Sequence, residues 1–281
     1  MTTPEQQKKA TSFFAMHFAK DVLLLPNAWD AASARIVEHS GFPAVATTSA
    51  GISFSLGYPD GQKITRREML EVVARIARTV KVPVTADVEA GYGDRPEDAA
   101  ETARAVIAAG AIGMNFEDAT GDPNHPLTDL PLQLERIRAI REAGEALSVH
   151  IVLNARTDVY LAQVGDAAKR YDETVRRLAA FRDGGADCVF VPGLRDASAI
   201  GRLVADLGCP INILAVSGSP PVPELAALGV KRISLGSGPM RAALGQLRKV
   251  AKEIREQGMY AAMEAAPSHA EMNELMTAAA K

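Results

Sequence analysis

The chain has 281 residues, which is enough for one large domain or two small ones. Its 31 Lys and Arg residues nearly balance 34 Asp and Glu residues, and the net charge of −3 gives no basic excess for nucleic acid or an anionic membrane surface. No run of about 18 apolar residues occurs that could span a membrane. The 2 cysteines are isolated, which argues against a disulfide scaffold, and residues 1–20 lack the apolar core and cleavage site of a secretion signal, so we expect a cytoplasmic protein.

Short apolar runs alternate with helix patterns from one end of the chain to the other. In chain order, the predicted strands are Val22–Pro26, Ala44–Ser49, Val82–Glu89, Ile112–Glu117, His150–Arg156, Cys188–Pro192, Ile211–Ala215 and Arg232–Gly236. They are rich in Val, Ile and Leu, which is typical of parallel strands covered on both faces. The predicted helices between them are Ala31–His39, Arg66–Val80, Pro96–Ala109, Pro131–Ala143, Ala167–Asp183, Ala197–Leu207 and Pro223–Leu228.

Eight strand–helix units over about 250 residues predict an α/β fold, a (β/α)8 barrel of the TIM type that forms one domain over residues 1–281. A doubly wound open sheet is the alternative. It is weakened by residues 26–30, which read Pro-Asn-Ala-Trp-Asp where a nucleotide-binding sheet has a glycine-rich turn. Residues 240–281, rich in Ala, Glu, Lys and Met, predict a C-terminal extension of one long and one shorter helix. One barrel helix needs less chain, so we expect the surplus to pack on another subunit of a homo-oligomer.

Acidic residues stand at the ends of two neighbouring strands. Asp87 and Glu89 are two residues apart at a strand tip, so strand alternation points them the same way. The next strand ends with Glu117, and barrel enzymes place their chemistry at these strand ends. Because anions this close repel unless a cation lies between them, the three acids predict a divalent metal site. Oxygen ligands favour Mg²⁺, with Mn²⁺ as an alternative, over zinc.

Further polar residues are expected around this metal site. Arg156 follows the fifth strand and can hold a carboxylate with two parallel hydrogen bonds, while Asp60 lies in a glycine-rich loop after the second strand. This combination predicts a small anionic substrate bridged to the metal. The simpler alternative is that single strand-end acids cap helices, and that Asn154 and Asp158 only brace the loop around Arg156.

Five segments also resemble a known family. Asp87–Gly93 is similar to the D-x-D/E-x-G-Y-G motif of the isocitrate lyase/phosphoenolpyruvate mutase superfamily, Phe116–Asp118 to its L/I/F-E-D motif, and Ala155–Asp158 to its A-R-T/V-D/E motif. Ser49–Gly51 and Asp60 match its substrate-carboxylate and acidic positions. The likeness runs in the same order from about residue 27 to residue 238.

The resemblance implies a helix-swapped (β/α)8 barrel, usually a tetramer, that binds Mg²⁺. Asp87 would touch the metal directly, while Glu89, Glu117 and Asp60 would act largely through waters. The substrate carboxylate would lie against the remaining matched positions, which are Ser49, Ala50, Gly51 and Arg156.

Some catalytic positions of the family differ in this chain. The lyases' loop cysteine is missing from residues 119–129, and Ala119 stands where the mutases and phosphonopyruvate hydrolases have lysine. Gly193 replaces a lyase glutamate, and Asn212 aligns loosely with a lyase asparagine. His125 in the altered loop is a candidate proton donor, although an exposed histidine without a chemical role is an equal alternative.

Three functions are therefore considered. The first is a Mg²⁺-dependent lyase or decarboxylase that cleaves a C–C bond of a small 2-oxo or 2-hydroxy di- or tricarboxylic acid through an enolate-like charge. The second is C–P chemistry of the phosphoenolpyruvate mutase or phosphonopyruvate hydrolase type, which Ala119 disfavours. The third is a barrel that binds 2-oxo acids without catalysis.

Overall fold

The computed structural model describes residues 3–277. At the centre of the molecule is a sheet of parallel strands. The strands are β1 Leu23–Leu25, β2 Asn27–Ala28, β3 Val45–Thr47, β4 Val84–Asp87, β5 Gly113–Glu117, β6 Val152–Arg156, β7 Cys188–Phe190, β8 Ile211–Leu214 and β9 Arg232–Ser234. Their order is β1-β9-β8-β7-β6-β5-β4-β3-β2, and every neighbouring pair is parallel. The sheet therefore closes almost completely, which confirms the predicted (β/α)8 barrel.

β1 matches the first predicted strand, Val22–Pro26, whereas β2 was not predicted and begins directly after Pro26. The segment before it pairs with β9 and the segment after it with β3, so together they join the two ends of the sheet. Proline has no N–H group and cannot continue a ladder, which explains why the strand breaks there.

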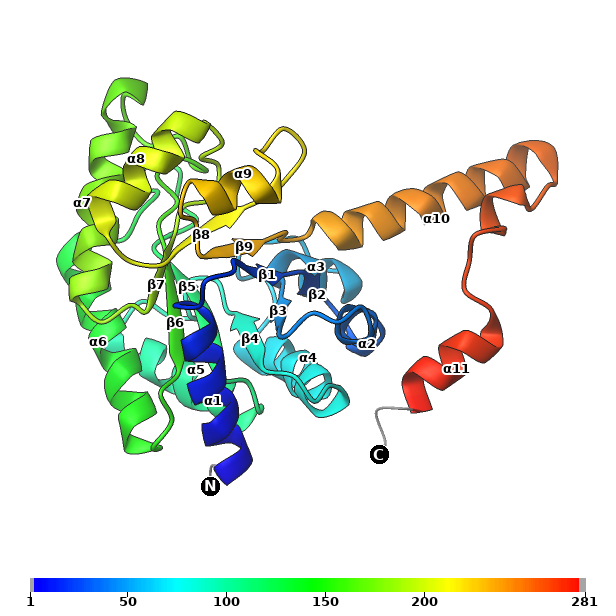
Figure 1. Cartoon of the computed structure of the whole chain (residues 1–281), viewed down its shortest axis with the longest axis horizontal. Coiled ribbons are helices and arrows are strands. Elements are labelled where there is room, and N and C mark those ends of the chain that lie inside the picture. The colour runs from blue at the N-terminus through cyan, green and yellow to red at the C-terminus, as the bar shows by residue number, and fades with distance from the viewer. Residues whose placement is uncertain (1–2, 278–281) are drawn as a thin grey trace.

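Helices surround the strands (Figure 1). They are α1 Pro4–Met16, α2 Ala31–His39, α3 Ser49–Ser55, α4 Arg66–Thr79, α5 Pro96–Ala108, α6 Leu130–Ala146, α7 Arg170–Asp183, α8 Ala197–Leu207, α9 Val222–Ala227, α10 Gly238–Gln257 and α11 His269–Thr277, with short 3₁₀ turns at Ala167–Lys169 and Ala261–Met263. The sequence did not predict α1 and α3. Among the described residues, no helix is both long enough and apolar enough to cross a membrane.

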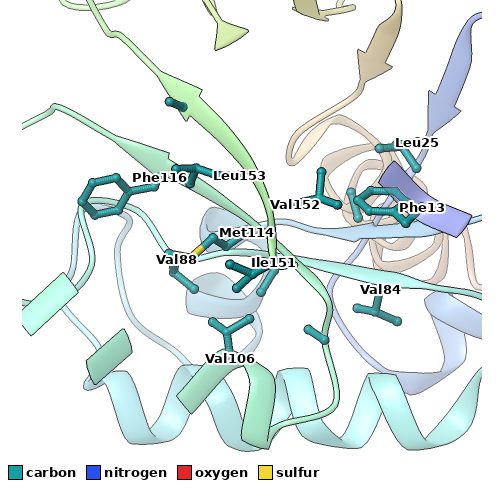
Figure 2. Close-up of a cluster of buried hydrophobic side chains, with 14 of the residues drawn as sticks. Phe13, Leu25, Val84, Val88, Val106, Met114, Phe116, Ile151, Val152 and Leu153 are labelled. Carbon is teal, nitrogen blue, oxygen red and sulfur yellow. The ribbon is translucent and has the colours of Figure 1, made fainter. Parts of the chain in front are cut away.

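α1 covers the end of the barrel where the strands begin. Gln6 donates to the carbonyl of Ile107, near the end of α5, and Gln7 donates to that of Ser148, just before β6. Phe13 is fully buried and belongs to the apolar core that Figure 2 shows together with Leu25 and other strand residues. Closing this end leaves the opposite end, where the strands finish, open for a site.

The C-terminal helices leave the barrel. α10 extends away from it (Figure 1), and Met240 is its only buried residue. Leu244, Leu247 and Ile254 on α10 are 46%, 60% and 43% exposed. The chain then returns, and the backbone carbonyl of Leu275 in α11 accepts a hydrogen bond from Arg35 of α2 at 2.9 Å. The long helix thus presents apolar side chains to the surroundings.

Candidate active site

A cavity of about 190 Å³ lies inside the barrel. The predicted site residues that line it are Ser49, Ala50, Asp60, Asp87, Arg156 and Asn212. A larger open groove of about 920 Å³ runs between α4 and α5, but it contains none of the predicted site residues. We therefore place the candidate site in the barrel cavity, at the ends of the strands.

Asp87 is the last residue of β4 and is held by three donors. Its Oδ2 accepts from the backbone N–H and the hydroxyl of Ser49, at 2.9 and 2.8 Å, and its Oδ1 accepts from the Asn115 amide at 2.9 Å. Ser49 opens α3, whose N-cap is Thr48. The turn that was predicted to bind a substrate carboxylate is therefore also what orients Asp87.

Glu89 does not continue the strand. β4 ends at Asp87, and Glu89 has a left-handed backbone with φ of 49°, so the alternation from which we predicted its direction does not extend to it. Glu89 is 2% exposed and does not line the cavity. Its carboxylate accepts a short hydrogen bond from the Gln62 N–H, while the Tyr92 hydroxyl lies 3.5 Å away. Burial, followed by the nearby charge of Asp87, raises the pKa of Glu89 to about 7.

Gln62 is a residue that sequence reasoning missed. Besides its N–H, its side-chain oxygen accepts from the Tyr92 N–H at 2.7 Å, so it ties the loop after β3 to the loop after β4. Asp60 lies in the same loop and lines the cavity. Burial and the charge of Asp87 raise the pKa of Asp60 above its ordinary value. Nothing in the local sequence of Gln62 indicates this role, because its partners lie about 30 residues away.

Arg156 is enclosed by acids. It is the ladder partner of Glu117, whose Oε2 lies 2.6 Å from its Nη1. Its Nε and Nη2 donate to the two oxygens of Asp158, at 2.5 and 2.7 Å. Asp158 therefore braces Arg156, as the simpler alternative held, whereas Asn154 donates to Asn115 and lines the cavity.

This pairing affects the pKa of both partners. Burial raises the pKa of Glu117 well above its ordinary range, although the charge of Arg156 opposes that rise. Burial alone would lower the pKa of Arg156, but Glu117 and Asp158 outweigh it and raise that pKa. Glu117 itself does not line the cavity.

Asp118 lies behind the cavity and has a structural role. It is fully buried and accepts from the hydroxyl of Thr157 at 2.7 Å, the N–H of Asp158 at 3.0 Å and Arg177 at 3.1 Å. Burial raises the pKa of Asp118 to about 6, with Arg177 opposing that rise. Asp118 thereby fixes the segment that carries Asp158, and through it Arg156.

The structure does not bring His125 to the cavity. Its loop is folded by an antiparallel bridge between Ala119 and Leu127 and by a hydrogen bond from the Thr120 hydroxyl to the His125 carbonyl. His125 is exposed and is not among the lining residues. Gly51 does not line the cavity either; it lies in α3, where a Cβ would come 2.5 Å from Thr48.

The acids fit a cation that takes few protein ligands directly. Within residues 3–277, no group of three or more His, Cys, Asp or Glu side chains is arranged to hold a metal ion. Asp60, Glu89 and Glu117 nevertheless lie close enough to Asp87 that its charge raises the pKa of each. The carboxylate of Asp87 at the cavity wall, with these further acids near it, suits Mg²⁺, because Mg²⁺ usually keeps several of its water ligands.

Comparisons with known proteins find a matching family model and similar chains. The family model for phosphoenolpyruvate phosphomutase matches residues 13–255. An uncharacterized protein of Mycobacterium tuberculosis strain H37Rv is 35% identical over 246 residues, covering 87% of this chain and 89% of the relative. An oxaloacetate decarboxylase of Chromohalobacter salexigens is 30% identical over 263 residues, covering 91% and 88%.

Solved structures are similar over almost the whole chain. A candidate lyase/mutase from Burkholderia cenocepacia J2315 superposes with a TM-score of 0.91 at 40% identity, covering 97% of this chain and 96% of that one. A phosphonopyruvate hydrolase in complex with oxalate and Mg²⁺ has a TM-score of 0.84 at 26% identity, covering 96% and 95%.

Proposed function

The chain belongs to the phosphoenolpyruvate phosphomutase family, and from that premise we propose that it is a Mg²⁺-dependent lyase or decarboxylase acting on a small 2-oxo or 2-hydroxy di- or tricarboxylic acid. The resemblance to the isocitrate lyase/phosphoenolpyruvate mutase superfamily is confirmed by the family match and by the relatives. The observation that carries the proposal is that Asp87, Asp60 and Arg156 line one cavity at the strand ends.

Asp87 would be the direct protein ligand of the metal. The two buried acids Glu89 and Glu117 would hold water ligands, because no three acids converge within the described part of the chain. When bound, Mg²⁺ supplies a positive charge that stabilises the negative charge developing on the substrate's 2-oxygen. Mn²⁺ would fit the same oxygen ligands.

Arg156 and the turn at Ser49 would hold the substrate carboxylate. A guanidinium has five N–H groups. Asp158 takes two of them and Glu117 lies against a third, which leaves one N–H on each terminal nitrogen for a ligand. Ala50 and Asn212 line the same cavity and would contact the rest of the substrate.

The proton donor would be Asp60. The sequence suggested His125 for this role, but His125 is exposed in the loop outside the cavity, whereas Asp60 lines the cavity and has a raised pKa. After the C–C bond breaks, this carboxyl group would return a proton to the substrate carbon.

A substrate panel tests the reaction. The protein with Mg²⁺ would be incubated separately with oxaloacetate, methylisocitrate, dimethylmalate and phosphonopyruvate, and pyruvate, succinate and phosphate would be followed by NMR. Pyruvate or succinate formed from oxaloacetate, methylisocitrate or dimethylmalate, in a metal-dependent way and faster than with Mg²⁺ alone, supports the proposal. Phosphate from phosphonopyruvate would favour C–P chemistry, and tight oxalate binding without turnover of any substrate would favour a non-catalytic binding barrel.

We also propose that the protein is a homo-oligomer, a dimer or tetramer, in which α10 packs on a second subunit. Three large apolar side chains on α10 are more than 40% exposed, and a long helix in water normally buries such a face. A cytoplasmic location stays a prediction from the sequence.

A further inference from the structure

Arg232 lies in the same cavity as the proposed catalytic residues, but at its floor. It is the first residue of β9, so it stands at the end of the barrel that α1 closes. Its exposed fraction is 2%, and it is among the largest fully buried side chains of the protein. The cavity therefore reaches from the acids at the strand ends down to a buried guanidinium.

This guanidinium has no acidic partner. Among the described residues, no carboxylate lies within 4.0 Å of its nitrogens, whereas Arg156 and Arg177 each have two acidic partners. Its one hydrogen bond is from Nη1 to Nε2 of His17, at 3.3 Å, and Nε has no partner. Four of its five N–H groups are therefore unused.

His17 does not balance the charge of Arg232. Its Nδ1 lies 2.9 Å from the carbonyl oxygen of Phe13, so Nδ1 carries the proton and the neutral ring accepts from Arg232 through Nε2. The ring of Phe13 lies 5.9 Å from the guanidinium carbon and offers only weak compensation. A buried charge without a counter-charge is strongly unfavourable, so something else is expected to complete this region.

Three other polar atoms around the cavity also lack partners. They are Oγ1 of Thr85, Oδ1 of Asn154 and Oδ1 of Asn212, and all three residues line the cavity together with Arg232. Unpartnered buried polar groups are rare, and four in one cavity indicate an occupant that forms hydrogen bonds. The positive charge of Arg232 selects an anion among such occupants. The Thr85 hydroxyl can donate to it after rotation and the Asn212 amide after flipping, because its partner is the Ser234 hydroxyl, whereas Asn154 is held by its donation to Asn115.

We propose that Arg232, with Asn212 and Thr85, forms a second anion subsite at the floor of the cavity that binds a small carboxylate. This inference deepens the proposed function, and it rests on residues other than the metal-side acids and Arg156. The carboxylate has two possible sources, the distal carboxylate of the substrate or a separate small anion bound beside it. Both use the same chemistry, a buried fork of N–H groups facing a carboxylate.

Calorimetric titrations test this subsite. The Mg²⁺-loaded wild type and the Arg232→Met variant would be titrated with oxalate, with 3,3-difluorooxaloacetate, a diacid that inhibits a structurally similar oxaloacetate acetylhydrolase, and with formate in the presence of saturating oxalate. Arg35→Met is the matched control, because Arg35 is also a buried arginine but contacts Glu38 and Leu275 outside the cavity. We expect this control to bind all three ligands within about twofold of the wild type.

Two results would support the subsite and identify its source. If Arg232→Met lowers the affinity for the diacid by about tenfold or more while the affinity for oxalate is unchanged, the distal carboxylate of the diacid binds at the floor of the cavity. If formate binds the wild type beside oxalate and the variant loses that binding, a separate anion occupies it. Arg232→Lys, which keeps the charge but loses the fork, should give intermediate affinities and replaces the methionine variant if that variant does not fold.

Two other results would overturn it. Equal affinities of the wild type and Arg232→Met for all three ligands would mean that water completes the floor. An equal loss of affinity for all three ligands, oxalate included, would mean that Arg232 only supports the residues that bind the metal. If the wild type bound no oxalate and turned over no substrate, the proposed function would fail, while formate binding that depends on Arg232, titrated then without oxalate, would still establish the subsite.

Discussion

The Asp87 carboxylate accepts hydrogen bonds from Ser49 and Asn115, three in all. An ionised carboxylate offers about four acceptor positions, so one position remains directed at the cavity. Asn115 in turn accepts from the Asn154 amide at 2.9 Å, and this short chain of amides holds the carboxylate in one orientation. The side chain is therefore preorganised for a cation before any cation binds.

Replacing Asp87 by asparagine should remove the metal site without unfolding the barrel. Asp87→Asn keeps the shape and one acceptor for Ser49 but loses the charge that a divalent cation needs. We expect Mg²⁺ affinity, measured by calorimetry, to fall on the order of 100-fold, and the metal-dependent turnover to fall with it. Asp183→Asn, at an exposed position, is the control. Full metal-dependent turnover by the Asp87 variant would show that the metal site is elsewhere.

His17 should make the fold sensitive to acid. Burial, followed by the charge of Arg232, lowers the pKa of His17 to about 4, against about 6.5 in an unfolded chain. Between these values the unfolded state binds the extra proton, so stability is fully present above about pH 6.5 and is lost as the pH falls toward 4. The loss should be on the order of 3 kcal/mol.

The variant His17→Gln separates this effect from general acid unfolding. Glutamine can still accept a hydrogen bond from Arg232 but does not titrate. Urea unfolding of both proteins at pH 7.5 and pH 4.5 should show a smaller loss of unfolding free energy for the variant. Identical losses in the two proteins would mean that His17 does not cause the acid sensitivity.

Among the helices and strands, α3 links the fold most closely to the site. Thr48 caps it, Ser49 in its first turn holds Asp87, and Gly51 lets the helix lie close to its neighbours. α3 was not predicted, because its seven residues are too few for a helical apolar pattern. Its position depends on β3 ending at Thr47, which the apolar run alone does not determine.

Gly51→Ala should displace α3 and weaken the metal site indirectly. A Cβ at residue 51 would lie 2.5 Å from Cγ2 of Thr48 and 3.1 Å from Cβ of Trp29, so the helix must shift. We expect Mg²⁺–oxalate affinity to fall by about tenfold or more, since Ser49 would no longer be placed to hold Asp87. Gly245→Ala, in α10 with no atom within 4 Å of the added carbon, is the control and should bind normally. Unchanged affinity of the Gly51 variant would separate α3 from metal binding.

The whole molecule is a barrel closed at one end by α1 and extended by α10 on another side (Figure 1). Closure by α1 brings His17 and Phe13 to Arg232, so it also shapes the floor of the cavity. The exposed apolar residues of α10 contribute nothing to the barrel itself. Their burial requires another surface, which is the reason to expect an oligomer.

Introducing a single charge on the apolar face of α10 should therefore dissociate the oligomer into monomers. We expect light scattering after size-exclusion chromatography to give the wild type a mass that is a multiple of 29.8 kDa, and the Leu247→Glu variant the mass of the monomer. Leu247 is 60% exposed here, so the substitution should not disturb the isolated chain. Lys249→Glu, a charge change at a nearby exposed position, should leave the assembly intact. A monomeric wild type would contradict the proposal.

The barrel could be predicted because its evidence is local. Apolar runs of strand length alternate with helix patterns, and the order of the acids along the chain follows directly from the motifs around Asp87, Glu117 and Arg156. α1 could not be predicted from periodicity, since only Ala10 and Phe13 of its 13 residues are buried. The reason for its position is the open end of the barrel, which the segment does not encode alone.

The amino-acid order thus determined the fold class, the family and six of the residues that line the cavity, Ser49, Ala50, Asp60, Asp87, Arg156 and Asn212. Folding in three dimensions decided the rest: the left-handed turn that removes Glu89 from the cavity wall, the acids that enclose Arg156, the exposure of His125 and the unpaired charge of Arg232. The physical reason is that strand register and side-chain partners join residues far apart in the chain, as with Arg232 and His17, which are 215 positions apart. Periodicity and motifs describe neighbours along the chain, whereas charge compensation depends on neighbours across the barrel.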